Sequence, residues 1–269
     1  MKKVSFYLFI ILIVVSCNSV KRVPEKEHLL VSTSILIDGK KNKNIELNDY
    51  VLQKPNSKLF GLPLSLYFHN LGNPNGPQTP KEWALLNPKK YNFYKSLFSE
   101  KQSIGVAKSY IGFNNWFLKN GENPIIIDDI KTLKTAENLQ LYFMNQGYFK
   151  SIITTKTDTL NNKKGKVTYS IIKGKPLFLD TISSNIPSKV LETIFKTDSA
   201  SFLKSGEQYN DQNFIKEAQR IIKLFRNSGV YNFSENHIQF ILEDSIPDNY
   251  KTNAEIVIAE HFKETIQGR

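Results

Sequence analysis

Two stretches of this chain, residues 131–149 and 213–231, repeat one local pattern 82 positions apart. In each stretch, four apolar residues are separated by three, three and four positions, which places their side chains on one face of a helix. The pattern predicts two equivalent helices that each cover an apolar surface. The residues are Leu133, Ala136, Leu139 and Phe143 in the first copy and Ile215, Ala218, Ile221 and Phe225 in the second.

Both expected helices end in an Asn-X-Gly sequence. Gly147 and Gly229 stand where a chain leaving a helix commonly turns into the left-handed region, which is unfavourable for a residue with a Cβ atom. Alternating apolar and polar residues then predict a strand over 149–157 in the first copy and over 236–243 in the second. Turns at 161–165 and near Pro247 lead into returning strands over 167–171 and 254–258.

The sequence before each copy extends the unit. Alternation over 31–37 and 177–181 predicts an opening strand in each. A short helix is expected over about 187–195 with Pro187 in its first turn, and Leu47 to Val51 marks a weaker counterpart in the first copy. Each unit then has the order strand, helix, helix, strand, strand, and the fold class is α+β.

This order, with its junction sequence, resembles the POTRA domains of outer-membrane β-barrel assembly proteins. The resemblance is carried by Asn145–Phe149 and by the hydrophobic strand Val167–Ile172 that runs on to Gly174. The second copy departs from it, because Val230 stands where the tyrosine is expected, with Tyr231 next. The resemblance implies tandem β-α-α-β-β domains, each a three-stranded mixed sheet covered on one face by two helices.

The chain is most similar to the POTRA region of lipid-anchored TamA-type and BamA-like proteins, since a lipoprotein-like start occurs together with the stretches 59–64 and 112–116. Members of that family continue into a membrane β-barrel, and the absence of repeated lipid-facing strands here favours a fragment or a truncated product. We expect the following organisation: signal peptide 1–16, lipidated linker 17–28, first domain 29–176 with an insertion at about 54–128, second domain 177–261, and a linker or the start of a further domain at 262–269.

The start of the chain predicts a lipid anchor. Lys2 and Lys3 precede an apolar run over 4–15, which is too short to span a bilayer and has the proportions of a signal-peptide core. Cys17, the only cysteine, follows Val14-Val15-Ser16 in the pattern of bacterial lipoprotein processing. The alternative is an ordinary secretory signal with a chance cysteine. Because Asn18 is not acidic and no acidic cluster follows it, lipoprotein sorting rules favour the outer membrane, with the protein facing the periplasm.

The chain carries a formal net charge of +11. For an exported protein this favours acidic lipid headgroups over nucleic acid as a partner, although lysines in turns can simply be solvated. The segment 54–128 holds seven of the eleven prolines and both tryptophans. It is expected to be folded, with Phe93, Tyr94, Leu97 and Phe98 on one side of a helix. It serves either as a contact surface for a partner or as a small satellite core.

No pattern in the sequence indicates catalysis or a cofactor. The four histidines, at 28, 69, 237 and 261, lack the spacing of a metal site on a helix. Asp128 and Asp129 precede an expected helix, so N-capping explains them better than chemistry does. We therefore expect no metal, no cofactor and no enzymatic activity. An enzyme would instead need a buried polar cluster within 54–128.

The resemblance implies binding by strand augmentation, in which an extended chain pairs with an edge strand. The implied partners are unfolded outer-membrane protein precursors, with an inner-membrane-anchored partner and a β-barrel absent from this chain as further candidates. The alternative is an envelope scaffold that binds one folded partner. The candidate residues are Cys17 for lipidation, Ser151, Ile152, Ile153, Thr154, Thr155, His237, Ile238, Gln239 and Phe240 on the edge strands, and Gly147, Tyr148, Gly229 and Tyr231 at the junctions.

Overall fold

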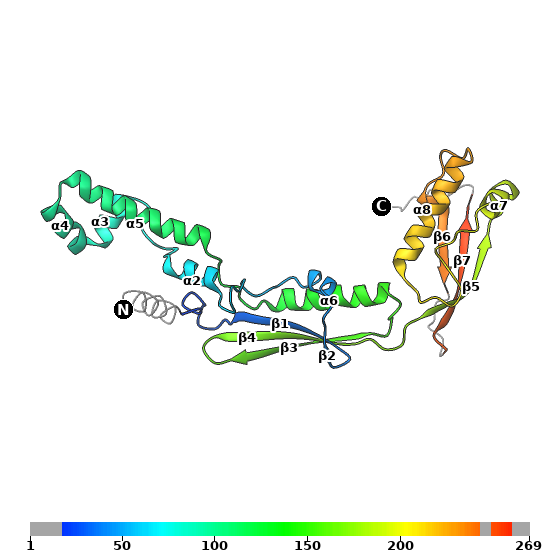
Figure 1. Ribbon diagram of the computed structural model, residues 1–269, viewed down its shortest axis with the longest axis horizontal. Coiled ribbons are helices and arrows are strands. Elements are labelled where there is room, and N and C mark those ends of the chain that lie inside the picture. Colours follow the sequence, from blue (N-terminus) through cyan, green and yellow to red (C-terminus); the bar gives the residue numbers. More distant parts are fainter. Residues whose placement is uncertain (1–17, 243–248, 260–269) are drawn as a thin grey trace, which may run out of the picture. The chain divides into compact units, whose positions relative to one another are not determined.

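The computed structural model describes residues 18–242 and 249–259 (Figure 1). Cys17, Pro247 and the expected linker from 262 lie outside the described residues. The chain divides into two compact units. The first unit comprises the chain up to Ile35 together with Val51–Lys134 and Thr155–Tyr169. The second unit comprises Leu36–Tyr50, Thr135–Thr154 and the chain from Ser170 onward. This division cuts through strands, and the domain boundaries expected from the sequence stay a prediction.

The second repeat has the expected order of elements. It consists of β5 (Phe178–Asn185), α7 (Lys189–Lys196), α8 (Asp211–Asn227), the 3-10 helix η2 (Glu235–His237), β6 (Ile238–Leu242) and β7 (Lys251–Ile258). The strands form a mixed sheet in the order β5-β7-β6, with β5 parallel and β6 antiparallel to β7. The α+β fold class is confirmed. Pro187 lies just before the helix, because Ser188 is the N-cap of α7.

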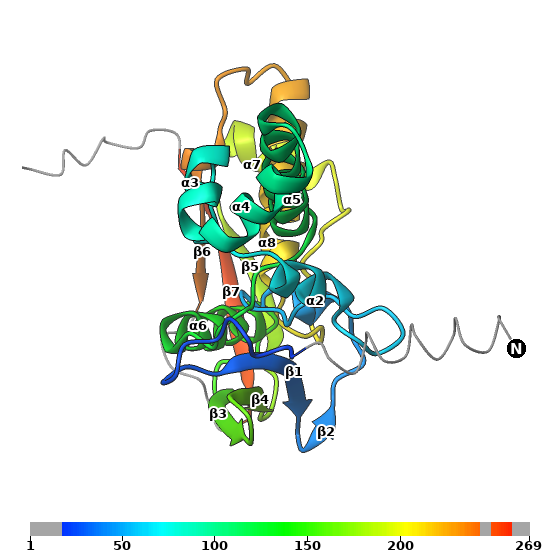
Figure 2. The ribbon, with the colours of Figure 1, turned by 90° about the vertical axis from the view of Figure 1, so that its left-hand side faces the viewer.

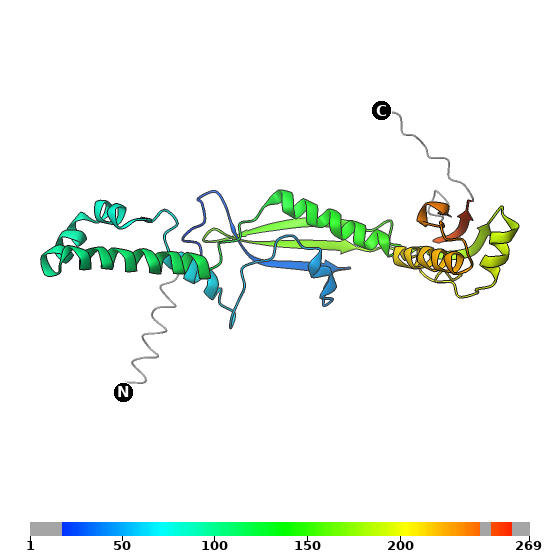
Figure 3. The ribbon, with the colours of Figure 1, turned by 90° about the horizontal axis from the view of Figure 1, so that it is seen from above.

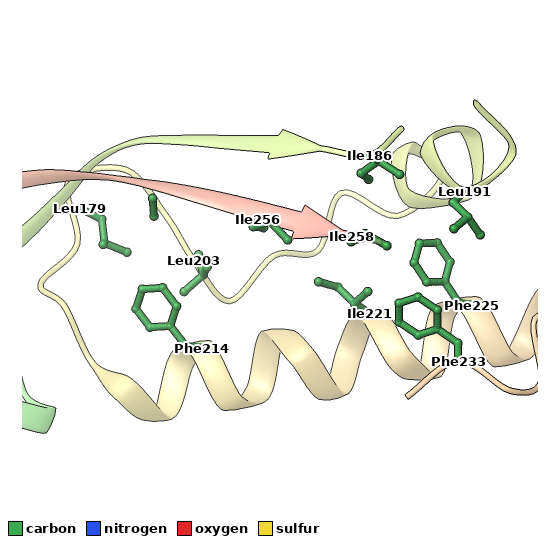
Figure 4. Packing of buried hydrophobic residues seen from close by; sticks show 11 residues of the cluster. Leu179, Ile186, Leu191, Leu203, Phe214, Ile221, Phe225, Phe233, Ile256 and Ile258 are labelled. Atoms are coloured by element: carbon green, nitrogen blue, oxygen red, sulfur yellow. The ribbon is translucent and has the colours of Figure 1, made fainter. Parts of the chain in front are cut away.

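Both helices of this repeat pack into one core (Figure 4). Phe214, Ile221 and Phe225 of α8 point toward Ile256 and Ile258 of β7, and Leu191 adds the contribution of α7. Ile221, Phe225 and Ile258 are fully buried. Burying side chains of this size stabilises a fold by about 1.5–3 kcal/mol each. The apolar stripe of α8 therefore anchors the helix to the sheet.

The first repeat has the corresponding strand order. Its elements are β1 (Leu29–Ile37), β2 (Lys40–Lys41), the 3-10 helix η1 (Glu46–Asp49), α6 (Asp129–Asn145), β3 (Ile152–Leu160) and β4 (Lys164–Ile172). The sheet order is β2-β1-β4-β3. Apart from the two-residue β2, the first strand again neighbours the last, and the middle strand again lies at the edge. Asp128 caps α6, as expected, because its Oδ1 accepts a hydrogen bond from the N–H of Lys131.

In α6 and α8, the buried face begins one position earlier than the sequence predicts. Leu133 and Ile215 were expected on the buried stripe and are 60% and 40% exposed. The positions just before them, Thr132 and Phe214, are buried instead. A helix buries a face wider than one line of residues, so the spacing left the start of the stripe uncertain by one position. The two helices still correspond, because these equivalent positions 82 residues apart are buried or exposed alike.

The helix ends also repeat at the level of hydrogen bonds. The N–H of Tyr148 donates to the carbonyl of Phe143, and the N–H of Val230 donates to that of Phe225. These are the bonds of a Schellman ending, and both intervening glycines have positive φ, +86° at Gly147 and +96° at Gly229. Val230 is therefore the equivalent of Tyr148. Tyr231 follows this residue, and its side chain is 80% exposed.

The two glycines differ in their surroundings, which gives a matched pair of substitutions. A Cβ on Gly147 would lie 2.9 Å from the carbonyl oxygen of Tyr209, whereas a Cβ on Gly229 would meet nothing within 4 Å. Gly229→Ala should cost about 1 kcal/mol of stability through backbone strain alone. Gly147→Ala should cost roughly 3 kcal/mol, because a backbone clash adds to the strain. Chemical denaturation of both variants tests this, and equal losses would contradict it.

The insertion is helical and lies between η1 and α6. It contains α2 (Leu64–Leu71), α3 (Pro80–Leu86), α4 (Pro88–Leu97) and α5 (Glu100–Asn120), with α5 alongside the other three (Figure 2). The expected satellite core exists, formed by Trp83, Ala107 and Ile111 with Tyr91 and Tyr94 packed against it. It does not account for every aromatic residue, since Phe93, Phe98 and Trp116 are about half exposed. Within the described residues, no helix has the length and apolar character needed to cross a membrane.

Candidate edge-strand site

The middle strand of each repeat ends its sheet. Neither β3 nor β6 pairs with a second strand on its outer side among the described residues. An edge strand leaves alternate N–H and C=O groups without a partner strand, so an added chain can complete the ladder. The strands that the sequence assigned to partner binding thus occupy edges in the structure. Binding itself stays a prediction.

Two of the predicted edge residues do not lie on these strands. Ser151 precedes β3, is buried, and its Oγ accepts a hydrogen bond from Nε2 of Gln140. His237 ends η2, and its ring stacks on Phe233 at 5.1 Å. Local turns explain both differences, because the N–H of Ser151 donates to Tyr148 and the N–H of His237 donates to Ser234. Ile152, Ile153, Thr154 and Thr155 lie on β3, and Ile238, Gln239 and Phe240 lie on β6.

The hydrogen bonds of β6 show which of its backbone groups face outward. The N–H of Ala259 donates to the carbonyl of His237, which makes this a hydrogen-bonded pair of the antiparallel ladder. Such pairs alternate, so Gln239 and Ile241 also direct their backbone groups at β7. The N–H and C=O of Ile238, Phe240 and Leu242 then point away from the sheet, while their side chains pack against the core.

A groove runs beside β3. It has a volume of about 500 Å³, and its lining comes from α6 and from Ile153 of the strand. The α6 residues are Ala136, Glu137, Gln140 and Leu141. Leu141 and Ile152 are each 56% exposed, so apolar side chains border an edge whose backbone can still pair. A strand added to β3 would find both a hydrogen-bonding partner and a place for alternate side chains.

The buried polar residues of the insertion hold main-chain segments together. Asn56 donates to the carbonyl of Asn123, Asn114 to that of Asn73, and Asn70 to that of Asn18. Burial lowers the pKa of His69, and the nearby Arg22 lowers it further. In the part of the chain that the structure describes, no cluster of histidine, cysteine, aspartate or glutamate could hold a metal ion. The absence of enzymatic activity stays a prediction.

One polar cluster was missed by sequence reasoning. Glu217 of α8 is fully buried, and both of its oxygens accept hydrogen bonds from Arg220, at 3.1 Å and 2.6 Å. Arg220 also donates to Asp198, and Glu217 accepts the N–H of Phe202. The cluster ties the segment 198–202 to α8. Its sequence signal is a glutamate within an apolar stripe, followed three residues later by an arginine.

The fold can be compared with known proteins. No family model and no curated protein matches the chain. Among solved structures, BamA from Haemophilus ducreyi lacking POTRA domains 1–3 is 9% identical, with a TM-score of 0.33 over 55% of this chain and 26% of that chain. POTRA domains 1 and 2 of the periplasmic domain of Omp85 from Anabaena are 8% identical, with a TM-score of 0.34 over 88% of this chain and 98% of that one.

A third structure is BamA POTRA domains 3–5 from Haemophilus influenzae. It is 11% identical, with a TM-score of 0.28 over 89% of this chain and 100% of that one. The second and third of these structures consist of POTRA domains.

Proposed function

We propose that this chain is the periplasmic, lipid-anchored POTRA region of an outer-membrane protein assembly system. In this proposal it holds extended segments of outer-membrane β-barrel precursors by strand augmentation and has no enzymatic activity. The observation that carries it is the recurrence of one arrangement: in both repeats the middle strand is an edge without an outer partner among the described residues.

Backbone pairing suits a client set of many sequences. An edge strand recognises an extended chain through N–H and C=O groups that every residue except proline supplies, so affinity depends little on side chains. The groove beside β3 adds an apolar surface without a specific polar pocket. An acyl chain on Cys17 would hold the edges near the membrane and raise their local concentration there.

Site-specific photocrosslinking tests this function. A photoreactive amino acid at Thr155, which is exposed on β3, or at Gln239 of β6 should capture several different precursors in cells. The same probe at Tyr231, which is exposed but not on an edge strand, is the control. Capture of one folded protein at Thr155 and Gln239 would support the scaffold alternative, and equal capture at all three positions would contradict strand augmentation.

Lipidation needs its own test. Wild-type chain should incorporate labelled palmitate and fractionate with the outer membrane, and Cys17→Ala should do neither. Equal labelling of the two proteins would remove the anchor from the proposal and leave strand capture standing.

A further inference from the structure

Helices α2 and α5 share an exposed aromatic surface. Phe68 of α2 packs edge-on against Trp116 of α5, with ring centroids 5.9 Å apart. The exposed fractions are 41% for Phe68, 50% for Trp116 and 66% for Phe113, which lies three residues before Trp116 on the same side of the helix. Leu71 extends this surface on α2 and is 52% exposed. Contiguous apolar surface of this kind marks a site that contacts something other than water.

Lysines line the same long helix, which Figure 3 shows as one unbroken rod. Lys101, Lys108 and Lys119 are exposed and are separated by seven and eleven residues, close to two and three helical turns, so they form one row. The row lies beside the aromatic side, while Ser103, Ala107, Ile111 and Asn114 form the buried side. Residues 64–120 contain seven lysines against two glutamates, a net charge of +5.

The beginning of the described chain is fastened to α2 (Figure 1). Nδ2 of Asn70 donates to the carbonyl of Asn18 at 3.0 Å, and Nζ of Lys21 donates to the carbonyl of Asn70 at 2.9 Å. Val23 is buried against Leu66 of α2. Asn18 directly follows Cys17, so any lipid attached there begins one residue from a segment held against this helix.

We propose that the α2–α5 insertion lies on the surface of a phospholipid bilayer that carries anionic headgroups. The aromatic side chains enter the boundary between headgroups and acyl chains, where tryptophan and phenylalanine are favoured, and the lysine row contacts phosphates. Charge complementarity and the attachment of residue 18 to α2 both point to this occupant. The proposal takes from the proposed function only the lipid at Cys17, and it is independent of strand capture.

Vesicle binding by the chain from Asn18 onward, which has no lipid, tests the surface itself. This chain should sediment with vesicles that contain phosphatidylglycerol and only weakly with pure phosphatidylcholine. Trp116 fluorescence should shift to the blue on binding, whereas Trp83 is 3% exposed and already shielded from water. Substituting all three row lysines by glutamine should lower partitioning on the order of a hundredfold.

A second variant separates apolar insertion from charge. Phe113→Ser with Trp116→Ser should lower partitioning by about tenfold or more, and both sites are exposed enough that the fold should survive. Tyr231→Ser, a matched loss of an exposed aromatic outside the insertion, should change nothing. Equal binding to neutral vesicles, or no effect of the lysine substitutions, would overturn the proposal. Self-association that the serine variant abolishes would assign the surface to a second copy instead. Photocrosslinking at β3 and β6 is unaffected by any of these results, so the two proposals fail separately.

Discussion

Glu217→Ala is expected to lower the free energy of unfolding by about 3–5 kcal/mol, the usual cost of breaking a buried ion pair from one side. The side chain of Glu217 is inaccessible to solvent, and that of Arg220 is 10% accessible. Removing the carboxylate leaves a guanidinium without its bidentate partner and the N–H of Phe202 without its acceptor. Urea denaturation followed by circular dichroism measures the loss.

Two further variants show whether the loss comes from the unpaired charge. Glu192→Ala removes a carboxylate of an exposed ion pair with Lys196, and it should leave the free energy of unfolding nearly unchanged, because solvent screens this pair. Glu217→Met combined with Arg220→Met should cost less than Glu217→Ala alone, because the double variant leaves no charge buried without a partner. A double variant that is destabilised by the sum of its single substitutions would contradict this explanation.

The repeat was the part of the fold that the sequence predicted best. Helical spacing and the glycines at 147 and 229 identified α6 and α8, and the order of elements followed from the strands around them. These features depend on local periodicity and on backbone conformation, which a sequence displays directly. The start of the buried stripe was missed by one position at Leu133 and Ile215, because tertiary packing selects which side of a wide apolar face turns inward.

The features that sequence reasoning missed depend on contacts between distant segments. The partners of Glu217 lie at 198, 202 and 220, and no local pattern brings the first two to α8. Ser151 and His237 were placed on strands because their neighbours alternate, yet a turn and a short 3-10 helix occupy those positions. In the insertion, the attachment of Asn18 to Asn70 spans 52 residues. Contacts between residues so far apart in the sequence produce no periodic pattern from which they could be predicted.

Phe240→Pro should abolish most capture of extended chains at β6 while leaving the sheet paired. The N–H of Phe240 points away from β7, so proline removes a donor at the free edge and no bond of the β6–β7 ladder. The lost hydrogen bond is worth about 1 kcal/mol, a factor of roughly five in affinity. The ring also obstructs an incoming strand. Photocrosslinking from Gln239 to precursors measures the effect, and we expect at least a fivefold decrease.

Matched substitutions isolate the backbone donor from the side chain. Phe240 packs against Phe214 at 5.2 Å between ring centroids, so Phe240→Leu serves as a control that loses this ring contact and keeps the N–H. Ile241→Pro should instead unfold the repeat, since the backbone of Ile241 faces β7. If Phe240→Pro remains folded and crosslinks as well as Phe240→Leu does, β6 does not recruit chains through its edge. Every strand added to β6 must pair with these outward-facing groups. Such a result would therefore leave β3 as the only strand to which the proposed function could still assign strand capture.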